Sequence, residues 1–264
     1  MATEILSIHN NRVKQWAQLL EKKGRDQQGK FLLEGIHLIM EAIQAHTEID
    51  CIVYSIDRGI PLELHRISDL SVEWIGVTEA ILAKCTDTIT PQGVFAIVNK
   101  LAWNAQTILN HHHSLVVVID GVQDPGNLGT IIRSADATQA SGVLIGKGSV
   151  DLYNPKTIRS TMGSLFHLPV AECNLEEILP LAGSKSIQLV NTNVQAEQHC
   201  YQLDLTKDTW FIVGNEGHGV SKQVAEFIGK HIKIPIHGEA ESLNVAMATT
   251  VLLYEALRQR HYNF

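Results

Sequence analysis

The sequence predicts an α/β protein whose C-terminal half is a parallel sheet with helices on both faces, preceded by a smaller α/β domain. Short β-branched runs alternate with helical stretches along the chain, and the later runs are apolar throughout, as in strands buried on both faces. The 264 residues are enough for two domains. We therefore expect one domain over 1–105, a linker over 106–113 and a second domain over 114–264.

The composition is that of a compact soluble chain, with 45% apolar and 19% charged residues. No run approaches the roughly 18 apolar residues of a membrane helix, and residues 1–12 lack the apolar stretch of a secretory signal. The cysteines at 51, 85, 173 and 200 form no C-x-x-C pair, so neither a zinc site nor a disulfide framework is indicated. We expect a cytoplasmic protein that binds no membrane and no metal.

The first hundred residues predict a small α/β unit. Apolar spacing predicts a helix over 13–20 that ends at Gly24, then a strand over 31–33 and a helix that begins at Gly35. Further strands are expected over 51–56, 72–77 and 94–98, with short helical stretches between them.

This N-terminal unit begins with a basic segment. Lys and Arg outnumber Asp and Glu within 9–30, whereas the whole chain has 21 Lys+Arg against 28 Asp+Glu. A basic segment on an acidic chain suggests contact with a nucleic acid at one end, and the alternative is a solvated basic helix face. The residues assigned to phosphate contact here are Arg12, Lys14, Lys22, Lys23 and Arg25.

The expected linker contains the triplet His111-His112-His113. Adjacent positions do not converge on one point, and no carboxylate lies close by in sequence, so we expect no metal there. In the second domain, the expected strands cover 115–119, 143–145, 187–191, 210–213 and 232–236, and the expected helices cover 127–140, 155–165, 175–181, 221–229 and 242–260. Ligands of such sheets bind at the carboxyl ends of the strands.

The first of three polar segments at strand ends is 124–136. Asn127 can cap the following helix, and Gly129 stands one turn before Arg133, which leaves a substrate room to approach the guanidinium. The alternative is a plain helix cap with an Arg133–Asp136 surface pair.

The second segment is a glycine-containing loop after a strand, and the third lies before the last helix. Gly214, Gly217 and Gly219 let backbone N–H groups reach a nucleotide-like ligand, although their order is not the dinucleotide fingerprint, and a tight turn is the alternative. In the third segment Ser242 can cap the last helix. The apolar stripe of that helix indicates core or a subunit interface.

Together, Asn127/Gly129/Arg133, then Gly214-Asn-Glu-Gly-x-Gly, then Ile-Pro-x-x-Gly followed by Ser-Leu-Asn, resemble in order and spacing the three motifs of the SpoU (TrmH-like) family. That family of RNA 2′-O-ribose methyltransferases belongs to the SPOUT superfamily. The resemblance extends into the first domain, where Asn11-Arg-Val-Lys14 and the residues from Arg25 to Gly35 look like the family's substrate-binding domain.

The resemblance implies an enzyme that transfers a methyl group from S-adenosylmethionine to a ribose 2′-hydroxyl. It also implies a trefoil knot in the C-terminal domain and a homodimer. By analogy with the type of N-terminal domain, ribosomal RNA is preferred as substrate over transfer RNA. The alternatives are a transfer RNA methyltransferase and a non-catalytic RNA-binding or ribosome-assembly protein. A nucleotide-dependent enzyme for small molecules is disfavoured, because the dinucleotide fingerprint is missing.

The resemblance also assigns the site residues. The catalytic set is Arg133, Asn127, Glu216, Ser242 and Asn244; the cofactor-binding set is Val213, Gly214, Gly219, Ile234 and Leu243. Lys156 and Arg159, close together near a helix start, join the residues expected to bind RNA phosphate. The family assigns proton removal to Arg133, yet a guanidinium is normally protonated. Arg133 is therefore either a perturbed base or a clamp on a phosphate.

Overall fold

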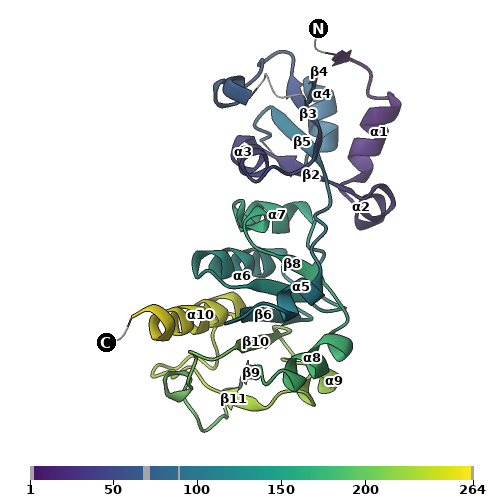
Figure 1. The fold of residues 1–264 in the computed structure, drawn as a ribbon. Helices are drawn as coiled ribbons and strands as arrows, with labels where there is room; N and C mark the ends of the chain where they lie inside the picture. Colours follow the sequence, from purple (N-terminus) through teal and green to yellow (C-terminus); the bar gives the residue numbers. More distant parts are fainter. Residues whose placement is uncertain (1–2, 68–71, 89, 263–264) are drawn as a thin grey trace. The chain divides into compact units, whose positions relative to one another are not determined.

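The computed structural model describes residues 3–67, 72–88 and 90–262, which form two compact units (Figure 1). Unit 1 is formed by the chain up to Ala102 together with Asp151–Phe166, and unit 2 by Trp103–Val150 together with the chain from His167 onward. The sequence predicts two domains that follow one another along the chain, each formed by one continuous stretch. In the structure the segment 151–166 packs with unit 1 instead, so unit 1 is built from two separate stretches of chain.

Unit 1 contains a mixed five-stranded sheet in the order β1-β4-β3-β5-β2. The strands are β1 (Thr3–Ile5), β2 (Lys30–Glu34), β3 (Ile49–Ser55), β4 (Glu73–Val77) and β5 (Val94–Asn99). β4 pairs in parallel with β1 and β3, whereas β5 pairs antiparallel with β3 and β2. Four of these strands lie where the sequence predicts strands; the three-residue β1 is too short to show an alternating pattern.

The helices of unit 1 that come before the linker are α1 (Asn11–Gln18), α2 (Lys22–Gln28), α3 (Ile36–Gln44) and α4 (Glu79–Cys85), with the 3₁₀ turn η1 (Leu62–Ile67). The prediction that Gly24 ends the first helix is wrong, because Gly24 lies inside α2. A Cβ at Gly24 would stand 2.0 Å from the backbone oxygen of Gln18, so glycine is needed for α2 to pack against the end of α1. The glycine that ends a helix here is Gly29, at φ +64°.

The returning segment of unit 1 carries α7 (Pro155–Thr161) and the 3₁₀ turn η2 (Ser164–Phe166). Arg25 is only 2% exposed; its guanidinium donates to the Asp151 carboxylate, at 2.9 Å from Nε, and to the carbonyl oxygens of Leu19 and Leu20. The ring of Phe31 packs on that of Tyr153, with centroids 4.7 Å apart. These contacts account for the placement of residues 151–166 in unit 1.

Unit 2 contains a six-stranded sheet in the order β11-β9-β10-β6-β7-β8, and every pairing in it is parallel. The strands are β6 (Leu115–Asp120), β7 (Gly142–Ile145), β8 (Val170–Glu172), β9 (Gln188–Thr192), β10 (Thr209–Gly214) and β11 (Lys230–Ile232). The parallel sheet expected for this half of the chain is confirmed. The short edge strand β8 was not anticipated.

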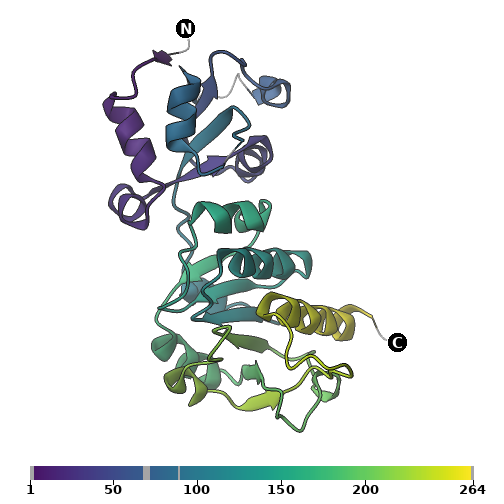
Figure 2. The same ribbon diagram turned by 180° about the vertical axis from the view of Figure 1, so that it is seen from behind.

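Helices cover both faces of this sheet, as Figures 1 and 2 show from opposite sides. The helices are α5 (Ala105–Leu109), α6 (Pro125–Ala137), α8 (Leu175–Ser184), α9 (Lys222–Ala225) and α10 (Val245–His261). Apolar residues of α5, α8 and α9 form one core with alternate residues of β6 and β10, such as Val116 and Trp210. α6 and α10 pack against each other, with the hydroxyls of Ser134 and Thr250 hydrogen-bonded at 2.7 Å. Among the described residues, no helix has both the length and the apolar composition needed to cross a membrane.

Several element boundaries differ from those predicted. α6 is capped by Asp124, not Asn127, because Pro125 occupies the first helical position, which it favours. α10 is capped by Asn244, not Ser242. The strand expected over 232–236 ends at Ile232, and the residues that follow form a loop. Part of the expected linker is the helix α5, in which Ile108 and Leu109 are buried.

The Arg25–Asp151 pair predicts a large loss of stability when one partner is removed. Asp151→Ala leaves the buried guanidinium without its counter-charge, so we expect the free energy of unfolding to fall by about 3–5 kcal/mol. Lys23→Ala, on the exposed face of the same helix, should change it by less than about 0.5 kcal/mol. Urea denaturation followed by tryptophan fluorescence measures both, and equal midpoints for the two variants would contradict the structural role of the pair.

Candidate active site

A cavity of about 740 Å³ opens at the carboxyl ends of β9 and β10 in unit 2. Most of its lining comes from three segments that are far apart in sequence: 191–194 at the end of β9, 212–220 at the end of β10, and residues within 242–248 at the start of α10; Ala225 and His231 complete it. This is the end of a parallel sheet at which ligands bind, and the volume is in the range of cofactor sites.

The wall after β10 is a tight loop closed on itself. Asn215 and Gly219 exchange two backbone hydrogen bonds, each 2.9 Å long, and Gly219 has φ +69°, which favours glycine. A Cβ at Gly214 would stand 2.2–2.3 Å from backbone atoms of Gly219 and Val220. The loop can therefore fold back over the end of β10 only because residue 214 has no side chain.

The Asn215 side chain fixes this loop and joins it to β6. Its Oδ1 accepts hydrogen bonds from the N–H groups of Gly217 and His218, at 2.9 and 3.1 Å. Its Nδ2 donates to the carbonyl oxygen of Gly121, directly after β6, at 3.0 Å. Sequence analysis did not single out Asn215; the available signal was an asparagine, a residue that bonds to nearby backbone, within the glycine loop.

Glu216 links the loop to the start of α6. Its carboxylate accepts hydrogen bonds from the Asn127 side chain at 2.9 Å and from the backbone N–H groups of Gln123 and Asp124 at 3.1 and 3.2 Å. The amide oxygen of Asn127 in turn accepts from Asn244 Nδ2 at 3.0 Å. This chain of contacts, the Glu216–Asn127–Asn244 relay, brings together one residue from each of the three sequence motifs.

The relay keeps the Glu216 carboxylate ionised. Partial burial by itself would raise the pKa of Glu216, but the hydrogen bonds from the Asn127 side chain and from the backbone of Gln123 and Asp124 outweigh it and hold this pKa below its ordinary value. At neutral pH the carboxylate is therefore charged. The acceptor is lost only when the pH falls through that lowered pKa.

The other two residues of the expected catalytic set lie outside the relay. Ser242 is exposed and lines the cavity beside Leu243. Arg133 is exposed on α6 and has no hydrogen bond or ion pair to any described residue. The alternative Arg133–Asp136 pair is not what the structure shows, because Asp136 pairs with His167, with Oδ2 and Nδ1 2.8 Å apart. The Arg133 guanidinium is thus available to a substrate.

The residues expected to hold the cofactor gather around this cavity. Val213, Gly214, Gly219 and Leu243 line it, and Ile234 lines an adjoining hollow that shares Leu243 and Ser242 with it. The walls combine apolar side chains with a loop whose backbone is exposed by glycine. A nucleoside-containing ligand such as S-adenosylmethionine fits this combination, since its ring needs apolar walls and its polar edge needs backbone groups.

The residues expected to bind RNA separate into two groups. Lys14 and Lys23 are exposed on α1 and α2 and have no ion pair among the residues that the structure describes, and Lys156 is exposed on α7. Lys22 is also exposed, but its ammonium pairs with Asp26 at 3.3 Å. These four lysines remain accessible to a polyanion.

The three arginines of that set have partners inside unit 1. Arg25 is buried against Asp151, so the prediction that it contacts an RNA phosphate is wrong. Arg12 forms a two-pronged pair with Glu73 at 2.8 and 2.9 Å. Arg159 donates to Asp87 at 3.0 Å and lies 3.5 Å from the Glu34 carboxylate. No three His, Cys, Asp or Glu side chains are grouped to hold a metal ion within 3–67, 72–88 and 90–262.

Two family models match the chain. The model of the SpoU rRNA Methylase family matches residues 114–254, and that of the MRM3-like substrate binding domain matches residues 10–96. The chain is 35% identical to the 23S rRNA (guanosine(2553)-2′-O)-methyltransferase RlmP of Bacillus subtilis, over 95% of this chain and 98% of that protein. It is 31% identical to the 23S rRNA (uridine(2479)-2′-O)-methyltransferase of Streptomyces viridochromogenes, over 98% and 93%.

Solved structures agree with these matches. The SpoU methyltransferase AviRb from Streptomyces viridochromogenes, in complex with the cofactor AdoMet, superposes with a TM-score of 0.90 at 31% identity, over 97% of this chain and 100% of that one. The AdoMet-bound rRNA methyltransferase from Sinorhizobium meliloti gives a TM-score of 0.86 at 31% identity, over 99% of each chain.

The parallel sheet, the glycine loop and the relay at its carboxyl edge define a methyltransferase-type cofactor site. With the matches above, the chain belongs to the SpoU rRNA methylase family. The resemblance found from the three motifs is confirmed, as are the α/β fold class and S-adenosylmethionine as the cofactor.

Loss of the Asn215 side chain should weaken cofactor binding. Asn215→Ala removes three hydrogen bonds worth about 0.5–1.5 kcal/mol each, so we expect the Kd for S-adenosylmethionine to rise about tenfold or more. Asn174→Ala is the matched control, because Asn174 caps α8 by accepting a backbone N–H and lies outside this cavity. Isothermal titration calorimetry measures both, and an unchanged Kd for Asn215→Ala would show that the loop holds its shape without this side chain.

Proposed function

We propose that the chain transfers the methyl group of S-adenosylmethionine to a ribose 2′-hydroxyl of ribosomal RNA. The observation that carries the proposal is the Glu216–Asn127–Asn244 relay, which joins all three motifs of the family at one cavity. The relatives named above are 23S rRNA 2′-O-methyltransferases by name, and two solved relatives hold AdoMet.

The residues of the site divide the work between holding the cofactor and presenting the RNA. Bound S-adenosylmethionine supplies an electrophilic methyl group. The glycine loop and Leu243 hold the cofactor, and the relay fixes the loop against the start of α6, the helix that carries Arg133. Because in-line displacement depends on placement, a rigid frame of this kind contributes directly to the rate.

Arg133 is the residue that we assign to the RNA side of the reaction. The 2′-hydroxyl must lose its proton to become an effective nucleophile. With no partner among the described residues, the Arg133 side chain either accepts that proton as a neutral guanidine or, as a guanidinium, clamps a phosphate while the proton leaves by another route. Ser242 lines the same cavity and completes the proposed catalytic set.

Unit 1 is proposed to bind the RNA substrate. Lys14, Lys22, Lys23 and Lys156 are exposed on it, and residues 10–96 match a substrate binding domain. Ammonium groups of this kind attract the phosphate backbone without reading its sequence.

We also propose a homodimer and a trefoil knot, and we keep the cytoplasm as the expected location. The dimer is supported by Met247 and Tyr254, which are about half exposed (50% and 51%) and lie seven residues apart on one face of α10.

The knot is supported by the hydrogen bonds that the loop after β10 and the start of α10 both form with residues 121–127.

Removing the Arg133 guanidinium should stop the reaction and leave cofactor binding intact. For Arg133→Ala we expect kcat to fall about 10²–10⁴-fold, the range for loss of a group that assists proton transfer, with the Kd for S-adenosylmethionine unchanged. Transfer of a radiolabelled methyl group to unmodified 23S rRNA measures kcat, and Arg258→Ala is the control. A mutant with wild-type turnover would exclude Arg133 from the mechanism.

Reversing two charges on unit 1 should weaken RNA binding alone. Lys14→Glu combined with Lys23→Glu should raise the KM for ribosomal RNA and lower the salt dependence of binding, while cofactor affinity stays constant. Filter binding at several KCl concentrations gives the slope of log Kd for the RNA against log salt concentration. Lys84→Glu serves as control, because its ammonium is already bonded to the Ile8 carbonyl oxygen at 3.0 Å. Equal slopes for the wild type and the double variant would contradict the proposed role of this surface.

A further inference from the structure

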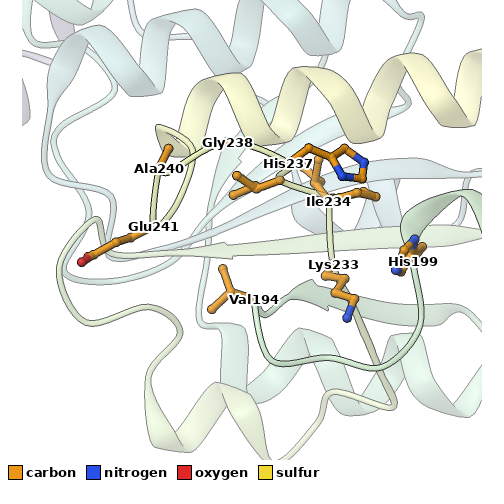
Figure 3. A pocket seen from close by; sticks show the side chains of 10 residues that line it. Val194, His199, Lys233, Ile234, His237, Gly238, Ala240 and Glu241 are labelled. Atoms are coloured by element: carbon orange, nitrogen blue, oxygen red, sulfur yellow. The ribbon is translucent and has the colours of Figure 1, made fainter.

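The cofactor cavity continues into an outer hollow formed largely by the loop that follows β11. The outer hollow has a volume of about 360 Å³ and is formed by residues within 233–241 together with Val194 and His199 (Figure 3). A smaller hollow, lined by Ile234 and Leu243, joins it to the cofactor cavity. Lys233 lines both this outer hollow and the joining one. Among the described residues that line the three hollows, Lys233 is the single Lys or Arg.

The backbone of Lys233 is held firmly while its ammonium group is not. Its N–H donates to the Gln198 carbonyl oxygen, and its own carbonyl oxygen accepts from Cys200, both at 2.9 Å. The ammonium has no hydrogen bond or ion pair within the part of the chain that the structure describes. A half-buried ammonium on a fixed backbone is suited to bind an anionic oxygen from outside the protein.

His199 adds a donor next to Lys233. The Gln202 N–H donates to the His199 carbonyl oxygen at 3.0 Å, and the Gln202 side chain accepts from the His199 backbone N–H at 2.8 Å, so the backbone of His199 is fixed. The His199 ring lines the same hollow as Lys233, the residue whose backbone it pairs with, and a ring N–H of histidine is a hydrogen-bond donor. Figure 3 shows the Glu241 carboxylate at the opposite end of the hollow from His199 and Lys233, so it does not neutralise this end.

We propose that Lys233 and His199 form a subsite for a phosphate of the substrate RNA, beside the ribose that is methylated. The inference rests on the proposed function. In unit 2, Asp and Glu outnumber Lys and Arg, so RNA that approaches the cofactor meets an acidic surface. A phosphate contact at the edge of the cofactor cleft offsets this repulsion and fixes the position of the backbone next to the methyl donor.

The test removes the charge and keeps the length of the side chain. For Lys233→Met we expect the Kd for an unmodified 23S rRNA transcript to rise about threefold, and the slope of log Kd against log salt to fall by about 0.7–0.9, the value of one phosphate contact. The Kd for S-adenosylmethionine should not change, and Lys233→Arg should restore RNA binding. Lys222→Met is the matched control, because Lys222 is exposed in unit 2 and lines none of the three hollows.

His199→Asn is the second variant, because asparagine is shorter than histidine and removes the ring from the hollow. It should weaken RNA binding in the same way. RNA binding by Lys233→Met that equals the Lys222→Met control overturns the proposal. A raised Kd for S-adenosylmethionine overturns it as well, since the ammonium would then hold the carboxylate of the cofactor. Lys233-dependent RNA binding without methyl transfer by the wild type would refute the proposed function and leave the subsite standing.

Discussion

The Glu216 carboxylate has to satisfy three donors that come from a different part of the chain. Two are backbone N–H groups that precede α6, and the third is the Asn127 side chain on its first turn. Such charge-assisted bonds are stronger than neutral ones, and a partly buried carboxylate without them would be costly. The loop after β10, the start of α6 and the start of α10 are therefore held at fixed distances, and the cofactor cavity is the space that they enclose.

This constraint explains why the site tolerates so much exposed loop. Neither the glycine loop nor the segment before α10 is regular structure, and each would be mobile without its side-chain anchors. Asn215 anchors the first to Gly121, and Asn244 anchors the second to Asn127. Rigidity at the cavity thus comes from amide side chains and one carboxylate, with the parallel sheet as their support.

The sequence predicts the features that depend on local pattern. The run at Val116–Ile119 is apolar because β6 is covered on both faces, and the helix expected from residue 221 begins directly after its cap, Ser221. The sequence does not predict which of two similar nearby residues takes a structural role. Ser242 and Asn244 are both good caps, and Asn244 is selected because its amide also reaches Asn127 across 117 residues. The role of Arg25 could not be foreseen either, because its partner Asp151 is 126 positions away.

The two-part construction of unit 1 has a consequence for how the chain is made. Proteins emerge from the ribosome from the N-terminus onward, and domains usually fold as they appear. Here Arg25 cannot find its carboxylate, nor Phe31 its aromatic partner, until the stretch that follows Val150 has emerged from the ribosome. By then β6 and β7 of unit 2 are already outside the ribosome. The five strands of the N-terminal sheet all precede this stretch and can pair early, but the buried guanidinium of Arg25 and the ring of Phe31 stay without their partners while part of unit 2 is translated.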